Sequence, residues 1–468
     1  MGQIFFIILA LVISFKILER PGIQKIPWFL SAILFFPLTI VILPKPHMPL
    51  YRFEIYVLLL VTIIQYKHWN GLLSRFPLKY VMFFLFISLL CIGIFDFRID
   101  PFLRIYRPIN FFIENFFICA ILYFYIKKPH DVVYLYKVIF KFFLVFSLYG
   151  VLNYVTRHNE FHTFISSVYG VRDFSNGNMV SGIDRFRISS FAWHAIYYGY
   201  LLAVVTLMAL FMFLKVNLRP IEKTFLVVLV VLLLINLILV NSRTPLFALT
   251  MGITIYIIFA TGIKQKIQVA LIVTSSFLFA LSYVPAVSKL FDESINTFSA
   301  SGSSFEGSSV QMRERQFLAS LAIFYKSPIT GNGYSYITEG LGYSSDQNQR
   351  QTGTDLMGFE SYVYKVLIEQ GSLGIVGNII FFIAIFIWLL KHYNQVTDFG
   401  KKLIVLTISI LVTFLLFIIG TGDLGSFPWT LSIIGINMKA IHLSQKILIR
   451  NKNLVSISPQ NITEDLNN

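Results

Sequence analysis

Repeated, nearly uninterrupted apolar runs constrain this chain more than any other feature of its sequence. The runs are about 16–24 residues long, close to the roughly 20 residues that a helix needs to cross a bilayer. Of the 468 residues, 56% are hydrophobic and only 13% are charged, whereas a soluble domain typically has about 25% charged residues. We therefore predict an all-α polytopic membrane protein rather than a soluble protein with several cores.

About 13 transmembrane helices (12–14) are expected from the runs. The segment Phe427–Leu443 is the weakest candidate, because it begins with a proline and carries Asn437 and Lys439. The candidate spans are Ile4–Leu18, Pro27–Leu43, Phe53–Tyr66, Leu78–Phe95, Pro108–Ile126, Val132–Val155, Phe191–Leu214, Phe225–Val240, Pro245–Thr261, Ile267–Val284, Leu373–Leu390, Leu403–Ile419 and Phe427–Leu443.

The distribution of Lys and Arg predicts the topology, because short cytoplasmic loops are enriched in both. One set of alternate connections, together with the C-terminal tail, holds 18 of these residues, and the other set of short connections holds 6. With an odd number of spans, the N-terminus then lies outside and the C-terminus inside the cytoplasm. The +15 net charge is mostly explained by this asymmetry, so no nucleic-acid partner is expected.

Two long loops, Thr156–Ser190 and Pro285–Ser372, fall on the outer side in this topology. The chain therefore divides into five parts. These are N-terminal transmembrane helices (residues 1–155), a first large outer loop (156–190), central transmembrane helices (191–284), a second large outer loop with an amphipathic helix (285–372), and C-terminal transmembrane helices with a cytoplasmic tail (373–468).

The outer face is selective for arginine, which the topology does not explain. The inner loops hold 14 Lys and 4 Arg, whereas the outer segments hold 3 Lys and 12 Arg. The planar guanidinium group of arginine binds phosphate or carboxylate through two hydrogen bonds, while the ammonium group of lysine is a point charge on a flexible chain. This bias favours a bound oxyanion at the outer face, and drift in a lysine-rich composition is the alternative.

The second long loop contains a predicted helix that starts after Ser308 or Ser309 and ends near Tyr325, with apolar residues at helical spacing. Arg313 shares a face with Gln316 and Ser320. Such a helix can lie on the lipid headgroups, or it can cover a cavity in the protein with its arginines pointing into that cavity. Both interpretations stay open. Pro328 ends the helix, and Gly331-Asn332-Gly333 forms a turn.

Two carboxylates flank the point at which the chain re-enters the membrane, Glu360 and Glu369. They are either solvated groups at headgroup level, or one of them is a general base in a desolvated pocket. Arg243 lies in a very tight turn between two spans, and an arginine this close to hydrocarbon is costly unless it is paired or faces water. Arg185 and Arg187 precede the span at Phe191.

No metal or cofactor is expected. His158 and His162 are four residues apart, but Glu160 does not adjoin His158, so this is not an HExxH metal motif. No CxxC pair and no glycine-rich phosphate loop are present.

Four short motifs follow one another along the chain, from about Arg187 to Gly374. They are Arg187-Ile188-Ser189-Ser190-Phe191 before a span, Ser242-Arg243-Thr244-Pro245-Leu246, Arg313 followed by Pro328-x-x-Gly331-x-Gly333, and Glu369-x-Gly371-x-x-Gly374. In this order, they resemble the motifs of the O-antigen polymerase/ligase superfamily.

One departure from the family pattern bears on the type of enzyme. Ligases of this superfamily carry His-Asn nine residues before the last glutamate, and that histidine is their proposed base. Here the corresponding residues are Glu360-Ser361. The resemblance therefore favours a polymerase, with a ligase as the alternative within the family and a lipid-linked oligosaccharide flippase as the alternative outside it.

The resemblance implies a metal-independent glycosyltransferase of GT-C-like architecture in the bacterial inner membrane. It would join undecaprenyl-diphosphate-linked oligosaccharides into O-antigen, capsule or exopolysaccharide, with a chain-length regulator and a flippase as possible partners. Arg187, Arg243 and Arg313 would bind and stabilise the diphosphate, and Glu360 would activate a sugar hydroxyl, with Glu369 in reserve. Further substrate contacts are predicted at Arg185, Arg315, Glu369, Tyr334 and Tyr336.

Overall fold

A computed structural model describes residues 2–36, 38–43, 47–65, 75–170, 186–260, 262, 266, 310–342, 359–423 and 425–457. The described part is almost entirely helical, as predicted. Its helices are α1 (Gly2–Glu19), η1 (Gly22–Lys25), α2 (Ile26–Phe35), α3 (Leu50–Gln65), α5 (Lys79–Ile94), α6 (Pro101–Phe112), η2 (Ile113–Phe117), α7 (Ile118–Tyr125), α8 (His130–Thr156), α9 (Glu160–Tyr169), α10 (Ala195–Lys215), α11 (Pro220–Leu239), α12 (Arg243–Ala260), α15 (Val310–Phe324), η4 (Tyr336–Gly340), α16 (Tyr362–His392), η6 (Tyr393–Gln395), α17 (Asp398–Thr421) and α18 (Ser426–Ile457).

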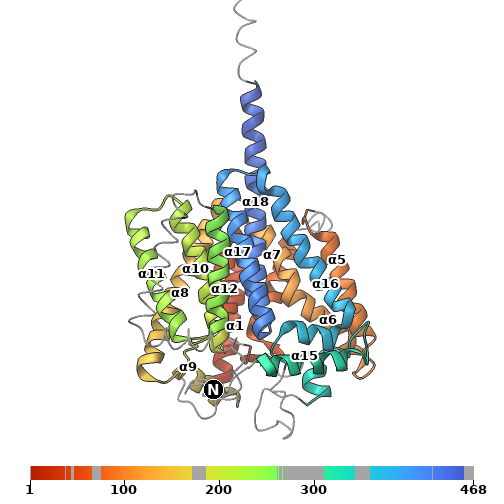
Figure 1. Ribbon diagram of the computed structural model, residues 1–468. Helices are drawn as coiled ribbons and strands as arrows, with labels where there is room; N and C mark the ends of the chain where they lie inside the picture. Colours follow the sequence, from red (N-terminus) through yellow and green to blue (C-terminus); the bar gives the residue numbers. More distant parts are fainter. Residues whose placement is uncertain are drawn as a thin grey trace, which may run out of the picture.

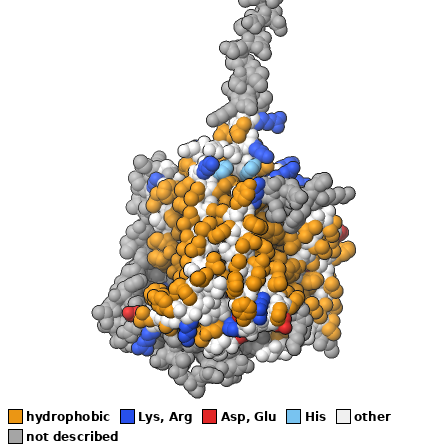
Figure 2. Space-filling model, turned by 90° about the vertical axis from the view of Figure 1, so that its right-hand side faces the viewer, with side chains coloured by type: hydrophobic (Ala, Val, Ile, Leu, Met, Phe, Trp, Pro, Cys, Tyr) orange, Lys and Arg blue, Asp and Glu red, His pale blue; other side chains and the backbone are white. Residues whose placement is uncertain are grey.

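The long helices stand side by side as one bundle (Figure 1). The N-terminus, α9 and α15 lie at one end, which we call the α15 end, and α18 leaves the bundle at the other. Apolar side chains cover the sides between these ends, and charged side chains gather above and below them (Figure 2). An apolar belt of this kind is the surface that a bilayer requires. The chain is a polytopic membrane protein, and the outward orientation of the α15 end stays a prediction.

Eight helices in the described residues are long and apolar enough to cross a membrane: α1, α6 to α7, α8, α10, α11, α12, α16 with η6, and α17. The predicted spans at Phe53–Tyr66 and Leu78–Phe95 correspond to the shorter helices α3 and α5. The predicted span Ile267–Val284 lies outside the described residues. The number of about 13 spans therefore stays a prediction.

The prediction of one continuous span over Pro27–Leu43 is wrong. The helix α2 ends at Phe35, and the chain then forms a two-stranded antiparallel hairpin of β1 (Val41–Leu43) and β2 (Met48–Pro49). Ten helical residues rise only about 15 Å, half the thickness of the hydrocarbon core. Hydropathy alone did not reveal the change, because the residues of β1 are as apolar as those of α2.

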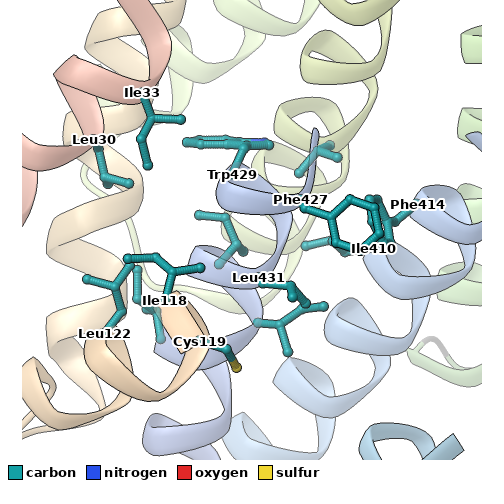
Figure 3. Close-up of a cluster of buried hydrophobic side chains, with 14 of the residues drawn as sticks. Leu30, Ile33, Ile118, Cys119, Leu122, Ile410, Phe414, Phe427, Trp429 and Leu431 are labelled. Carbon is teal, nitrogen blue, oxygen red and sulfur yellow. The ribbon is translucent and has the colours of Figure 1, made fainter. Parts of the chain in front are cut away.

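The weakest predicted span, Phe427–Leu443, lies in α18 at the centre of the bundle. Trp429 and Leu431 are buried among side chains of α2, α7 and α17 (Figure 3). The buried Asn437 on α18 is satisfied by neighbouring helices, since Tyr136 Oη donates to Asn437 Oδ1 at 2.8 Å and Asn437 Nδ2 donates to Thr407 Oγ1 at 3.1 Å. A helix that contacts protein rather than lipid does not need a uniformly apolar surface, which explains its weak hydropathy signal.

Close packing of α18 against α7 depends on Gly435. A β-carbon at this position would collide with the backbone carbonyl of Cys119 on α7, and a backbone atom cannot move aside as a side chain can. We expect Gly435→Ala to destabilise the bundle by about 1–3 kcal/mol, the usual cost of overpacking, and to lower its melting temperature in detergent. Gly262→Ala is the control, because its β-carbon would meet nothing within 4 Å. Equal melting temperatures for the two variants would contradict this account.

Candidate functional site

Three of the predicted catalytic residues lie around the turn that joins α17 to α18 at the α15 end. The Nη2 of Arg313 donates to the carbonyl of Gly420 at 3.1 Å. A β-carbon at Gly420 would lie 2.9 Å from Thr244, the neighbour of Arg243, and one at Gly422 would lie 3.2 Å from the carbonyl oxygen of Glu360. Segments that are far apart in sequence, at α12, α15, the start of α16 and the end of α17, thus converge at one place.

The orientation of α15 brings its polar face toward this turn. Gln316 and Ser320 are completely buried, and the Oε1 of Gln316 accepts a hydrogen bond from the backbone N–H of Glu360 at 3.3 Å. The carbonyl of Arg313 accepts from the hydroxyl of Tyr364 at 3.3 Å. The helix forms where it was predicted, and Arg313 points inward rather than toward lipid headgroups. Arg315 is exposed on the same helix.

Two of the glycine motifs pack against each other beside the site. The backbone N–H groups of Asn332 and Gly333 donate to the carbonyls of Ile368 and Glu369, both at 2.9 Å. In the other direction, the N–H groups of Ser372 and Leu373 donate to the carbonyls of Pro328 and Ile329, at 2.9 and 3.1 Å. The turn after α15 is therefore hydrogen-bonded to the part of α16 in which the helix is interrupted. This interruption is centred on Gly371.

Gly371 has φ +61° and ψ −158°, a conformation that is available almost only to glycine. A β-carbon there would also collide with the backbone nitrogen of Gly331. We expect Gly371→Ala to separate the two motifs, displace Glu369 and lower the melting temperature in detergent, while the bundle still inserts. Membrane-fraction abundance and thermal melting test this, and the outcome against it is a Gly371→Ala protein with the wild-type melting temperature.

Glu369 is buried, and its Oε1 accepts from the backbone N–H of Ile337 at 3.2 Å. This carboxylate therefore holds the loop that begins at the glycine turn. The contact suits a residue that positions the loop better than a general base that must be accessible to the substrate. Tyr334 is 5% exposed, and its hydroxyl donates to the carbonyl of Leu89 at 3.1 Å. Burial raises the pKa of Tyr334 well above its usual value. Its ring packs against that of Phe111, with the ring centroids 5.6 Å apart, and Tyr336 stacks under the guanidinium of Arg98 at 4.8 Å. The substrate contacts of both tyrosines stay predictions.

An ion pair that the sequence did not reveal lies at the same turn. Lys365 Nζ is 3.2 Å from Asp423 Oδ2, and both side chains are partly exposed. Lys365 is in the first turn of α16 and Asp423 follows the end of α17. The pair ties the segment after Glu360 to the turn around which Arg313 and Thr244 pack. An Asp within a short glycine-flanked connection between two apolar runs is the signal that could have indicated it.

The predicted arginine of the first loop, Arg187, follows α9 at the α15 end. Ser189 and Ser190 of its motif are held by Asn159, whose Nδ2 donates to Ser189 Oγ at 3.3 Å and to the Ser190 carbonyl at 2.8 Å. His162 Nε2 lies 2.9 Å from the Ala192 carbonyl. These contacts explain the polar residues of α9 as anchors for the segment that carries Arg187. Arg185 lies outside the described residues.

Burial, and then the neighbouring positive charge of Arg187, lower the pKa of His194 to about 4. The imidazole is therefore neutral at neutral pH and accepts a hydrogen bond from the backbone N–H of Ile196 at 3.2 Å, which caps α10. Among the residues that the structure describes, no group of three His, Cys, Asp or Glu side chains could hold a metal ion.

Several of the arginines that are predicted to lie outside contact carboxylates of this chain. Arg98 forms two hydrogen bonds with Asp96, at 2.9 and 2.7 Å. Arg107 forms two with Glu339, at 3.0 and 2.7 Å. Arg52 pairs with Glu114 in the π-helical turn η2. The preference for arginine is thus explained in part by ion pairs within the chain, in which the planar guanidinium binds a carboxylate through two hydrogen bonds.

The comparison with known families covers most of this site. Residues 228–379 match the family model described as O-antigen ligase. This segment carries a domain of the O-antigen polymerase/ligase superfamily. It includes Arg243, Arg313, Glu360 and the interlocked glycine motifs, whereas Arg187 and Asp423 lie outside it. A search of curated proteins finds no match. The family match gives no support to the flippase alternative, and it does not separate polymerase from ligase.

Proposed function

We propose that this protein is a polysaccharide polymerase of the bacterial inner membrane. It transfers a growing glycan from undecaprenyl diphosphate to a new lipid-linked repeat unit at the outer face of the membrane. The observation that carries the proposal is the convergence of Arg243, Arg313 and Glu360 around the turn at Gly420 to Asp423. A transferase of this kind needs positive charge for the diphosphate and a base for the acceptor, and both lie at one end of an apolar bundle.

The reaction exchanges one bond at the anomeric carbon of the donor glycan. A hydroxyl oxygen at the non-reducing end of the acceptor attacks this carbon, and the bond from the carbon to the diphosphate oxygen breaks. Glu360 takes the proton of the hydroxyl, and undecaprenyl diphosphate leaves with the electron pair. Arg243 and Arg313 stabilise the negative charge that develops on the leaving group, and α12 begins at Arg243, so its first N–H groups add to the positive potential.

A polymerase is favoured over a ligase by the residues that precede α16. Glu360 and Ser361 occupy the place at which the resemblance expects the His-Asn pair of a ligase. The ligase remains the second candidate, because the matched family model is itself described as O-antigen ligase. The two activities share the donor and differ in the acceptor, which is a lipid-linked repeat unit for a polymerase.

The deciding experiment is a glycan profile of cells that lack the gene, complemented with the wild-type chain or with empty vector. We expect single repeat units and no ladder without the protein, and a full ladder with it. If long chains instead accumulate on undecaprenyl diphosphate and never reach their final acceptor, the protein is a ligase. A normal ladder in the deletion strain excludes both activities.

A further inference from the structure

The helix α15 carries its polar and apolar residues on the opposite faces from those of an ordinary surface helix. Gln316 and Ser320 are 0% exposed, whereas Leu318 is 58% and Tyr325 is 73% exposed. A surface helix of a soluble protein normally buries its apolar stripe and exposes polar residues. The inward polar face is explained by the contacts of Arg313 and Gln316 at the candidate site, but the outward apolar face needs a partner of its own.

The outward residues form a continuous stripe. Leu318, Ala322 and Tyr325 are spaced by four and three positions, which places them on one side of the helix, and Ile329 lies in the turn that follows it. All four are exposed, Ile329 at 64%. A stripe of this length on a monomer is more than scattered surface hydrophobicity.

The stripe continues into the lipid-facing side of α16. The backbone N–H of Leu373 donates to the carbonyl of Ile329 at 3.1 Å, so the end of the stripe is fixed beside the point at which α16 enters the apolar belt. From there Val376, Ile379 and Ile383 are exposed along α16, and this side of the molecule shows apolar side chains down to its charged lower end (Figure 2). The two apolar surfaces therefore lie next to each other.

The residues at the ends of the stripe match the chemistry of a membrane interface. Arg315 and Lys326 are exposed near its two ends, and both can reach lipid phosphates with the charged head while the stem rests on apolar surface. Tyr325 combines an apolar ring with a hydroxyl, the kind of side chain that is enriched at the level of the headgroups.

We propose that α15 lies in the bilayer interface at the α15 end, with the stripe Leu318–Ala322–Tyr325–Ile329 inserted among acyl chains and its polar face turned to the candidate site. The helix is then an in-plane anchor and not a lid exposed to water. Resting on the proposed function, this arrangement holds Arg313 at headgroup depth, where the diphosphate of a membrane-anchored substrate lies.

Site-directed fluorescence in vesicles tests the depth of the helix. In full-length protein with Cys91→Ala and Cys119→Ala, a small fluorophore is attached to Leu318→Cys, Ala322→Cys or Tyr325→Cys, one at a time. The protein is reconstituted into phosphatidylethanolamine and phosphatidylglycerol vesicles with brominated acyl chains. Glu160→Cys, whose side chain is 82% exposed at the start of α9, is the polar control, and Ile379→Cys on α16 is the lipid-facing control.

We expect bromine quenching at the three stripe positions to approach that at residue 379 and to exceed that at residue 160 at least twofold, with iodide in the water showing the reverse order. Stripe labels that respond to iodide and not to bromine would overturn the proposal. Three positions are used because one label that disturbs the fold leaves two others to decide. The measurement needs no enzymatic activity, so its outcome is independent of the polymerase assignment.

Discussion

Glu360→Gln is expected to abolish the glycan ladder while the protein is still made and inserted. The amide keeps the size of the side chain but cannot take a proton from a sugar hydroxyl. Loss of a general base lowers the rate by about 10²- to 10⁴-fold, which is enough to leave single repeat units on a gel. The backbone N–H of Glu360, which binds Gln316, is unchanged by the substitution, so the local fold is expected to persist.

Glu314→Gln is the matched control, because it makes the same substitution at a different glutamate, on the exposed side of α15. It is expected to give a full ladder. In a purified assay with lipid-linked repeat units, Glu360→Gln should lower kcat and leave KM within about threefold, since a base acts in the transition state and not in binding. A Glu360→Gln variant with wild-type kcat would assign the base to another residue, and Asp423 at the same turn would be tested next.

Periodicity and hydropathy were enough to predict most of the helices, because a bilayer imposes one length and one composition on every helix that contacts it. The prediction was weakest where a segment does not contact lipid. The central position of α18 removes the need for a uniformly apolar surface, and its buried Asn437 is satisfied by Tyr136 and Thr407. The hairpin after α2 was missed for the opposite reason, since β1 is apolar and adjoins an apolar helix.

The candidate site was predictable as a set of motifs but not as a set of contacts. Arg243, Arg313 and Glu360 were selected by residue type and family resemblance, and the structure brings them around a single turn. The partners of other charged groups are far apart along the chain: Arg107 and Glu339 are separated by 232 positions, and Lys365 and Asp423 by 58. No local pattern encodes such pairs. For this reason the sequence counted Arg107 among the arginines available to an external oxyanion.

The arginine hypothesis gives the second large expected effect. Arg243→Lys and Arg313→Lys keep the positive charge but lose the planar fork that can bind a diphosphate through two parallel hydrogen bonds. Removing one preorganised donor of this kind costs about 10²- to 10³-fold in rate. We therefore expect alanine at either position to remove the ladder and lysine to reduce it at least about tenfold. In Arg313→Lys the hydrogen bond to Gly420 is lost as well.

Arg219→Lys is the control for charge-preserving change, because this side chain is 80% exposed at the opposite end of the bundle. It should leave ladder length and intensity unaltered. Initial rates of the purified variants, measured at several concentrations of lipid-linked repeat unit, separate the two ways in which an arginine can act. A fall in kcat indicates stabilisation of the departing diphosphate, and a rise in KM alone indicates uniform binding. Full activity of both lysine variants would show that positive charge suffices at this turn and that two-point recognition of the diphosphate is not used.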